Sequence, residues 1–226
     1  MSHPAPALTL WEAFAYGIIQ GVTEFLPVSS SGHLALAHQL GLGSLPEELE
    51  LRFDVLLHAA TLVAIGIAFR REIVASLAWR PRFYLCVLIS IVPAGLAGAV
   101  GKSYVEAAGE SFWVLGALYV FTAVLLTVSE QLSKRRALAV DEHPPHVMLE
   151  DVTPRQALWV GALQVFSLLP GVSRSGSTIA GGLIGGMQPK LAVSYAFLVG
   201  LPLIAAAAAK DAVDGGFHRL AAQVGF

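Results

Sequence analysis

The sequence has few charged residues: 13% of its 226 residues are Asp, Glu, Lys or Arg, about half of the roughly 25% found in soluble domains. Hydrophobic residues make up 55%, and the mean hydropathy is +0.67. These values exclude an ordinary water-soluble globule. A basic excess is also lacking, because the net charge is −2. Without a surface that displaces counterions from nucleic acid, no nucleic-acid partner is expected.

Cysteine is nearly absent. Cys86 is the single cysteine of the sequence, which excludes an internal disulfide and a cysteine metal cluster. The first ten residues, MSHPAPALTL, contain neither Lys nor Arg, so the basic segment that opens a secretory signal peptide is lacking. We therefore expect membrane insertion to depend on the hydrophobic segments of the mature chain.

Long apolar runs are what the sequence does contain. Four of them cover residues 53–69, 83–100, 112–128 and 191–209, and each is 17 to 19 residues long. At about 1.5 Å per residue, such a helix reaches roughly 26 to 28 Å, close to the roughly 30 Å of a bilayer's hydrocarbon layer. The runs predict four transmembrane helices in an all-α, polytopic membrane protein, with a single membrane domain at residues 1–226.

Two further apolar stretches are interrupted. Residues 8–28 run into LPVSSSGH and residues 157–169 into LPGVSRSGS, where Pro and Gly end a helix. Irregular backbone within a bilayer is tolerated only beside protein or a water-filled cavity. We therefore expect two re-entrant helix hairpins, at residues 9–41 and 155–188, whose breaks line one cavity.

Basic residues orient the chain. Nine Lys or Arg residues lie within residues 70–82 and 129–155 or at position 190, against four on the other side. The positive-inside rule places the first group in the cytoplasm, including a solvated loop at residues 129–154.

The sequence also repeats itself. Residues 9–32 align without gaps on residues 153–176, and eight of the 24 positions are identical. Both copies open with a capping box, so Glu12 in the first copy is interpreted as a helix cap. Three spans between the copies make the second one enter from the opposite face. This predicts an inverted-topology repeat whose half-helices point their positive N-termini at a shared anion.

The two repeats are unequal. Repeat one covers residues 9–128, with three spans after its hairpin, whereas repeat two covers residues 153–226 and has one. By symmetry, two C-terminal spans are lacking. The exposed flank predicts either a homodimer formed through a set of small residues or an unstable, poorly active protein. The same small residues suit close helix packing within one chain; they are Gly181, Gly182, Gly185 and Gly186.

Gln20 and Glu24 lie four residues apart, and thus on one face of the first hairpin helix. A carboxylate inside a membrane is energetically unfavourable unless it binds a cation, accepts hydrogen bonds or takes a proton. We therefore interpret Glu24 as functional. One carboxylate with a neighbouring amide makes a modest site for Mg²⁺ or Ca²⁺, shared with the phosphate groups of a substrate and with water.

Three serines, Ser29 to Ser31, stand just before His33. Hydroxyls, turn N–H groups and an imidazole at this spacing can bind phosphate, attack it or pass a proton to a leaving group, although helix caps use the same residue types. Arg174 favours the phosphate interpretation, because a guanidinium inside the membrane needs an anion and fits phosphate in a bidentate manner.

The other histidines give weaker signals. His58 follows Asp54 by four residues, a spacing that fits either a side chain facing the cavity or a pair on the helix surface. Four more are interpreted as structural: His38, His143, His146 and His218.

The motifs QGVTEFLPVSSSGH and LLPGVSRSGST closely resemble the two signatures of the bacterial undecaprenyl-diphosphate phosphatase family, also called the bacitracin-resistance protein family. The similarity extends through FDVLLHAATLVA to about Ala209. It implies a multi-pass enzyme of the bacterial inner membrane that hydrolyses undecaprenyl diphosphate to undecaprenyl phosphate and phosphate with a divalent cation. Such an enzyme recycles the lipid carrier for peptidoglycan synthesis, confers bacitracin resistance and opens its site toward the periplasm. Family members usually have two more C-terminal spans.

The resemblance also implies roles for residues. Glu24 and Gln20 match the family's acidic, metal-binding pair. Ser30 and His33 match its catalytic serine and histidine, and Arg174 matches its phosphate-binding arginine. Further polar residues are expected to bind the substrate: Ser29, Ser31, Ser173, Ser175 and Thr178.

Two other functions stay open. An inverted repeat also suits a carrier or flippase that moves an anionic lipid without cleaving it, but a carrier needs neither a nucleophile nor a general acid, so Ser30 and His33 favour the enzyme. The lacking spans are the one argument for an inactive, truncated relative. The sequence leaves Ser30, His33 and a metal-bound water as candidate nucleophiles.

Overall fold

The computed structural model describes residues 9–42, 47–76, 81–101, 111–138 and 148–213, and within them the secondary structure is helical, with turns and no strands. The expected all-α class is confirmed. The elements in chain order are α1 (Leu10–Phe25), α2 (Ser30–Gln39), α3 (Glu47–Ala68), α4 (Arg70–Ser76), α5 (Pro81–Val100), α7 (Phe112–Leu138), η1 (Leu149–Asp151), α8 (Pro154–Gln164), η2 (Val165–Leu168), α9 (Arg174–Ile184) and α10 (Pro189–Val213).

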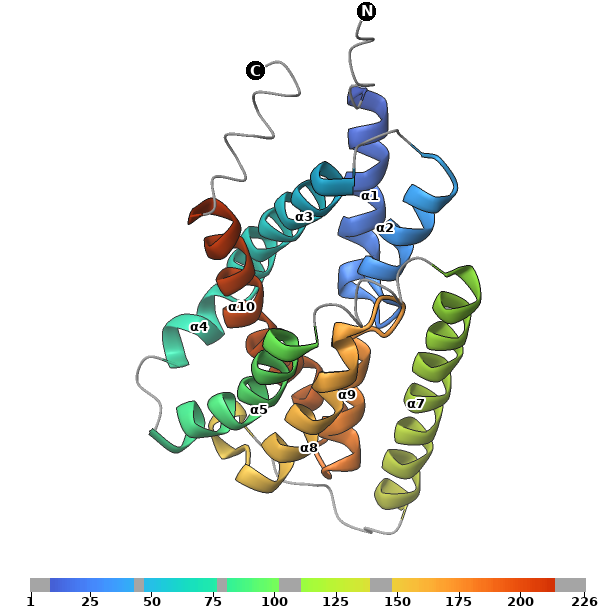
Figure 1. Ribbon diagram of the computed structural model, residues 1–226. Helices are drawn as coiled ribbons and strands as arrows, with labels where there is room; N and C mark the ends of the chain where they lie inside the picture. The colour runs from blue at the N-terminus through green and yellow to red at the C-terminus, as the bar shows by residue number, and fades with distance from the viewer. Residues whose placement is uncertain (1–8, 43–46, 77–80, 102–110, 139–147, 214–226) are drawn as a thin grey trace, which may run out of the picture.

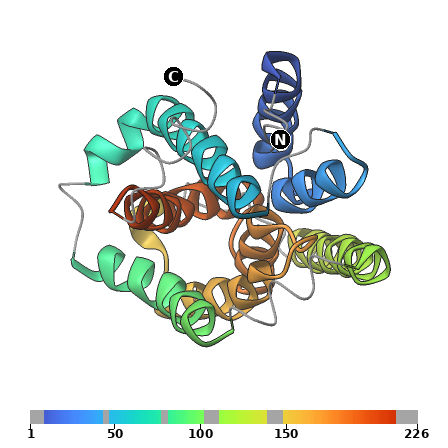
Figure 2. The ribbon, with the colours of Figure 1, turned by 45° about the horizontal axis from the view of Figure 1, so that its top comes forward.

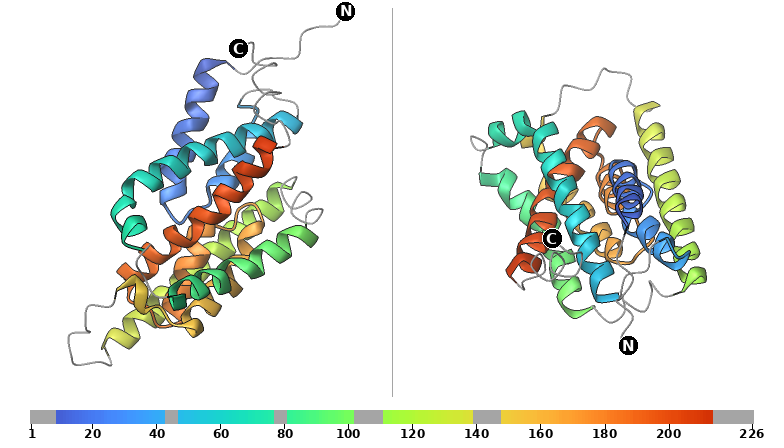
Figure 3. Two further views of the ribbon diagram at one scale, coloured as in Figure 1. Left: turned by 90° about the vertical axis from the view of Figure 1, so that its left-hand side faces the viewer. Right: turned by 90° about the horizontal axis from the view of Figure 1, so that it is seen from above.

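Three helices in the described part of the chain are long and apolar enough to cross a bilayer on their own: α5, α7 and α10. The helix α3 qualifies only together with α4, to which it is joined at a bend of 75°. The four predicted spans thus correspond to three single helices and one bent pair. In the left view of Figure 3 the long helices run across the molecule in one general direction, as expected of a multi-pass membrane protein.

Large apolar side chains cover the outside of the molecule. Trp11 and Phe14 on α1 are 81% and 62% exposed, and Trp113 on α7 is 90% exposed. Soluble proteins rarely leave so much apolar surface in contact with water. These faces fit the hydrocarbon of a membrane, which agrees with the low charge of the sequence.

Two segments predicted as loops are helical in part. The helix α7 continues to Leu138, so the first ten residues of the predicted solvated loop, 129–138, are helical. The stretch SEQLSKRRAL is rich in good helix formers. Arg136 within it donates to two carbonyls at the C-terminal end of α9, at 2.8 and 2.9 Å. The short helix α4 occupies the beginning of the predicted 70–82 loop.

Both hairpins begin and resume with the same local structure. Thr9 and Thr153 open α1 and α8 with capping boxes, which confirms the predicted role of Glu12. Ser29 and Ser173 open α2 and α9, and each hydroxyl accepts from the N–H three residues later, at 3.2 and 3.0 Å. The sequence similarity of the two copies is therefore matched by their helix starts.

The hairpins point their breaks at each other. Figure 1 shows α1 and α2 on one side of the molecule and α8 and α9 on the other, with the breaks near the centre. The helix α10 packs against α9, α3 and α5, and α7 packs against α9; Figure 2 shows α10 between α3 and α5. The irregular backbone of each break therefore lies against protein, which supplies partners that lipid cannot.

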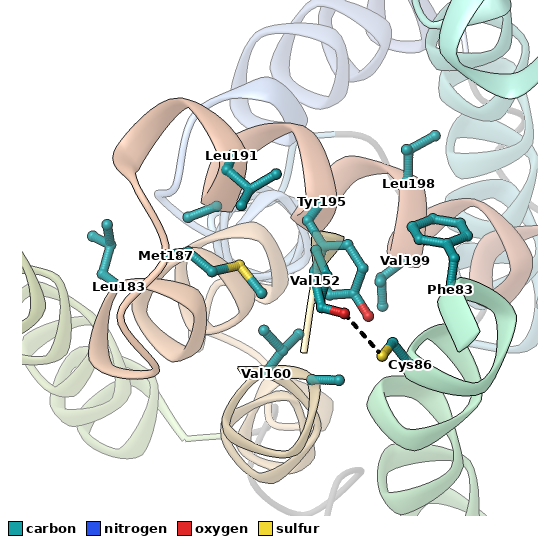
Figure 4. Close-up of a cluster of buried hydrophobic side chains, with 12 residues drawn as sticks. Phe83, Cys86, Val152, Val160, Leu183, Met187, Leu191, Tyr195, Leu198 and Val199 are labelled. Carbon is teal, nitrogen blue, oxygen red and sulfur yellow. Dashed lines mark hydrogen bonds between the residues drawn. The ribbon is translucent and has the colours of Figure 1, made fainter. Parts of the chain in front are cut away.

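The main hydrophobic core lies between α5, α8, α9 and α10 (Figure 4). Phe83 of α5, Val160 of α8 and Tyr195 of α10 are buried in it. The Cys86 thiol donates to the Val152 carbonyl at 3.3 Å, so the single cysteine is a packing residue at the edge of this core. The core fixes the second hairpin against two long helices, α5 and α10.

Close approach of these helices depends on glycine. A Cβ on Gly161 of α8 would lie 2.6 Å from the Ile89 carbonyl oxygen of α5, and one on Gly181 of α9 would lie 2.7 Å from the Trp159 carbonyl oxygen of α8. Gly182 faces α10 and is buried as well. The predicted packing role is confirmed for Gly181 and Gly182, which are buried against helices of the same chain. Gly186 is exposed, and a homodimer formed through these residues stays a prediction.

Candidate functional site

The two breaks touch one another. Ser175 Oγ donates to the Leu26 carbonyl at 3.4 Å, and a Cβ on Gly32 would lie 2.8 Å from Cα of Gly171. Gly171 has a φ of +92°, which glycine adopts without penalty. Ser29 has a φ of +67°, the one positive value at a non-glycine position in the described residues. Strain of this kind persists where surrounding contacts enforce it, often beside a functional site.

A buried ion pair joins the two hairpins. Glu24, near the end of α1, is 5% exposed. Arg174, the first residue of α9, donates from Nη2 to Oε1 of Glu24, although the two residues are 150 positions apart. Either charge alone would be unfavourable when buried in a membrane protein. Pairing the two charges offsets much of the free energy of desolvation. The structure thus brings together the two charged residues found at the breaks of the sequence.

The second carboxylate oxygen of Glu24 is the centre of a polar cluster. Ser30 Oγ donates to Oε2 at 2.5 Å, and Gln20 Nε2 donates to it at 3.2 Å. His58 Nε2, from α3, lies 3.7 Å from the same oxygen. A hydroxyl, an amide and an imidazole therefore converge on one carboxylate oxygen, while the other oxygen is taken by the guanidinium.

Two adjoining cavities open beside this cluster. The first, which we call the polar pocket, has a volume of about 250 Å³ and is lined by Glu24, Ser30 and Arg174 with other polar residues. The second, the apolar cavity, has a volume of about 620 Å³ and is walled mainly by small and aliphatic side chains of α5 and α10. The two share lining residues: Ser31, His58, Ser167, Leu168 and Arg174. The polar pocket and the apolar cavity are therefore neighbouring parts of one site.

The expected substrate-binding serines lie where the sequence indicated. Four of them line the polar pocket: Ser29, Ser31, Ser173 and Ser175. Thr178 has another position. Its hydroxyl donates to the carbonyls of Arg174 and Ser175, at 2.9 and 3.1 Å, so it stabilises the first turn of α9 from within.

His33 lies to one side of the pocket. Its Nδ1 is 2.8 Å from the Ser29 carbonyl oxygen and 3.1 Å from the Tyr119 hydroxyl of α7. Of the described residues, those that line the two cavities do not include His33. Its imidazole holds the strained serine loop in place, and its catalytic role stays a prediction. Tyr119 gave no signal in the sequence, because nothing distinguishes it from other aromatic residues of a membrane helix.

The sequence left the role of one residue of the site open and did not identify another. The spacing of His58 from Asp54 left its direction open; the structure turns it into both cavities, and its Nδ1 lies 2.7 Å from the Asp54 carbonyl oxygen rather than from the carboxylate. Gly200 of α10 lies against Arg174, so that a Cβ there would collide with Nη1. Glycine at this position makes room for the guanidinium, a need that no local pattern reveals.

The donors of the site fit a cation that is shared with a substrate. Within the described residues, no group of three or more His, Cys, Asp or Glu side chains is placed to hold a metal ion. However, Gln20 is 1% exposed, and its Oε1 has no hydrogen-bond partner among the described residues. Glu24 Oε2 and this unpaired oxygen are hard ligands of the kind that Mg²⁺ and Ca²⁺ bind, and phosphate oxygens and water would complete the coordination.

Comparison with known proteins gives concordant results. Residues 13–225 match the model of the family described as bacitracin resistance protein BacA. The undecaprenyl-diphosphatase of Carboxydothermus hydrogenoformans is 37% identical over 204 residues, covering 89% of this chain and 72% of that protein. The enzyme of the same name from Rubrobacter xylanophilus is 37% identical over 214 residues, covering 88% and 75%, and that from Halothermothrix orenii is 33% identical over 219 residues, covering 94% and 80%. With a match over nearly its whole length, this chain belongs to the bacitracin resistance protein BacA family.

Proposed function

We propose that this protein is a membrane phosphatase that hydrolyses undecaprenyl diphosphate to undecaprenyl phosphate and inorganic phosphate. The reaction would recycle the lipid carrier of peptidoglycan synthesis and confer resistance to bacitracin. Relatives that are 33% to 37% identical to this chain over the aligned residues carry the name undecaprenyl-diphosphatase. One observation carries the proposal: the polar pocket and the apolar cavity adjoin, with Arg174 among the residues that line both.

This pairing of cavities suits an amphiphilic substrate. A diphosphate needs hydrogen-bond donors and positive charge, which the polar pocket provides through Arg174 and the serine hydroxyls. A prenyl chain needs apolar walls, which Ala94 and Gly98 of α5 and Ile204 of α10 provide. A small water-soluble phosphate ester would leave the apolar cavity without a function.

The helix starts add to the anion site. Both α2 and α9 begin at the polar pocket, because Ser30 and Arg174 are their first residues and line it. The N–H groups of a first helical turn lack partners within the helix, and the helix dipole is positive at this end. Two such ends beside one pocket favour the two phosphate groups of a diphosphate.

We assign the nucleophile to Ser30, because its hydroxyl is already hydrogen-bonded to a buried carboxylate. Ser30 Oγ attacks the terminal phosphorus and Glu24 accepts the hydroxyl proton. The bond from phosphorus to the bridging oxygen breaks, and that oxygen leaves with undecaprenyl phosphate and takes the proton from Glu24. A water then attacks the phosphoserine, its proton passes through Glu24 to the serine oxygen, and phosphate is released.

Arg174, Gln20 and His33 support this reaction. The Arg174 guanidinium would bind the transferred phosphate and balance the negative charge that develops on it. Glu24 and Gln20 would hold Mg²⁺ or Ca²⁺, which would neutralise phosphate oxygens when bound. His33 would fix the serine loop through the Ser29 carbonyl.

We also propose that the two hairpins are re-entrant and form an inverted-topology repeat in the bacterial inner membrane, with the site open toward the periplasm. The matched helix starts and the meeting of the breaks support this arrangement. The clustering of arginines on one side of the predicted spans supports the orientation.

Phosphate release by the purified protein tests the proposal. Undecaprenyl diphosphate in detergent micelles should be hydrolysed by the wild type, and EDTA should suppress the reaction. Ser30→Ala should reduce kcat by about 1000-fold or more, because it removes the nucleophile. Full activity of Ser30→Ala would assign the attack to water. Movement of the lipid across proteoliposomes without phosphate release would support a carrier instead.

A further inference from the structure

His58 is the imidazole that faces the proposed phosphate site. It lines both the polar pocket and the apolar cavity, whereas His33 lines neither and contacts the Ser29 carbonyl and the Tyr119 hydroxyl. Nδ1 of His58 lies 2.7 Å from the Asp54 carbonyl oxygen. Since a carbonyl oxygen only accepts, Nδ1 donates the hydrogen of this bond, and Nε2 is the ring nitrogen that lies near Glu24.

This arrangement is the one that metal-binding histidines adopt. Such a histidine donates its second ring N–H to a backbone carbonyl or a carboxylate, which fixes the tautomer and the direction of the ligating nitrogen. Two ligands that each lie about 2.1 Å from one cation are about 3 to 3.5 Å apart. His58 Nε2 and Glu24 Oε2 are 3.7 Å apart, so a shift of a few tenths of an ångström brings both onto one ion.

Gln20 provides the independent observation. Its side chain is 1% exposed, its Nε2 lies 3.2 Å from Glu24 Oε2, and its Oε1 has no partner among the described residues. A buried oxygen without a donor is unfavourable, and a cation held by Glu24 would give Oε1 the positive partner that it lacks.

We propose that His58 Nε2 is a protein ligand of the divalent cation, together with Glu24 and Gln20. The inference rests on the proposed function in one respect: phosphate oxygens of the substrate complete the coordination. A nitrogen ligand changes which ions the site favours, since imidazole suits first-row transition metals, whereas Ca²⁺ prefers oxygen ligands alone. The site therefore favours Mn²⁺ over Ca²⁺, and His58 is the residue responsible.

Electron paramagnetic resonance of bound Mn²⁺ tests this without any turnover. Purified protein in detergent is titrated with Mn²⁺, with and without methylene diphosphonate, a diphosphate mimic that is not hydrolysed. Spin-echo modulation then reports ¹⁴N bound to the metal. We expect nitrogen coupling in the wild type, and its loss in His58→Gln together with Mn²⁺ affinity that is about tenfold or more weaker. Ca²⁺ affinity should change much less.

His38→Gln is the matched control. His38 is also largely buried, with 9% of its side chain exposed, and it pairs with Asp54 and Glu50, but it lines neither cavity, so nitrogen coupling should persist. Should His58→Gln fail to fold, wild-type protein labelled with ¹⁵N-histidine replaces it, because the ¹⁴N modulation must then give way to that of ¹⁵N.

Three results would overturn the proposal: no Mn²⁺ bound in either arm, bound Mn²⁺ without nitrogen coupling in the wild type, or equal Mn²⁺ affinity in His58→Gln. The last two would leave His58 as the ion-pair partner of Glu24. Nitrogen-coupled Mn²⁺ in a protein that releases no phosphate would refute the proposed function alone and leave the metal site standing.

Discussion

The Arg174 side chain contacts one anion in the structure and is proposed to bind a second in the reaction. It donates to Glu24 in the structure, and in the proposed reaction it also donates to phosphate. A planar guanidinium with five N–H donors can contact both at once, whereas the lysine ammonium is a point charge on a flexible stem. The shape of the guanidinium, in addition to its charge, is therefore needed.

Arg174→Lys should lose most of the activity although the charge is kept. One lost charge-assisted hydrogen bond corresponds to about 1.5 to 3 kcal/mol, or about a 10- to 150-fold drop in kcat/KM. The measurement is phosphate release from undecaprenyl diphosphate, with a melting curve to show that the variant is folded. A kcat/KM equal to that of the wild type would remove Arg174 from the phosphate site.

Gly200→Ala should impair the reaction without touching the substrate. The added Cβ collides with Arg174 Nη1, so the guanidinium must turn away from Glu24. We expect kcat/KM to fall about tenfold or more, because small misplacements of a binding group are costly to the rate. Gly116→Ala in α7 is the control, since a Cβ there meets nothing within 4 Å. Equal rates for the two variants would show that α10 does not fix the guanidinium.

The sequence identifies candidate site residues where a charged residue interrupts an apolar segment. Glu24 and Arg174 stand out because a charge in an apolar run needs a compensating partner. His58 does not, because its spacing from Asp54 suits two orientations, and the rotation of α3 toward α1 decides between them. That rotation is set by side-chain packing between segments far apart in the sequence, which periodicity cannot report.

At the level of elements, Gly17 and Gly161 occupy the same position in the two repeats but different surroundings. A Cβ on Gly17 of α1 meets nothing within 4 Å, whereas one on Gly161 of α8 would lie 2.6 Å from the Ile89 carbonyl oxygen and 3.1 Å from Ser90. The repeat conserves the helix but not its neighbours. The pair therefore separates an effect of helix propensity from an effect of packing.

Gly161→Ala should destabilise the protein, and Gly17→Ala should not. Forcing a methyl group against the α5 backbone costs about 1 to 3 kcal/mol, which for a chain of this size lowers Tm by several degrees. Alanine at Gly17 should be neutral or slightly stabilising, because alanine is the better helix former. Thermal unfolding in detergent compares the two. Equal melting temperatures would contradict the close contact of α5 and α8.

Hydropathy alone does not predict the residue at which a helix ends. The predicted start of α7 at residue 112 agrees with the structure, but its end at Leu138 lies beyond the predicted span. Hydropathy marks where a chain leaves the bilayer, whereas a helix ends where its backbone hydrogen bonds end. Capping boxes are local and were predicted correctly at Thr9 and Thr153. The apolar cavity was not predicted, because helices that lie far apart in the sequence form its walls.

Across the whole molecule, the two hairpins differ in how much protein surrounds them. In α9, eight of 11 residues are buried, whereas α1 buries four of 16. Local opening is easier where fewer apolar contacts must be broken. The first hairpin is thus attached to the molecule more loosely than the second.

Hydrogen exchange should therefore be faster in α1 and α2 than in α8 and α9. The comparison uses mass spectrometry of the wild type in detergent, because lipid-like surroundings are the same for both hairpins. Arg174→Lys should speed exchange in the first hairpin further, since it weakens the contact between the two. Equal protection of both hairpins would show that the ion pair, or lipid, compensates for the difference in burial.

The separation of Glu24 from Arg174 by 150 residues sets an order of events on the ribosome. At about 5 to 20 residues per second, the carboxylate is made roughly 8 to 30 seconds before its partner. During that interval the first hairpin carries a charge that no cation of this pair balances, so it must remain hydrated or neutral. It settles beside the second hairpin only after Arg174 has emerged. In the proposed reaction, which needs Arg174, the nascent chain is therefore inactive until most of its helices have been synthesised.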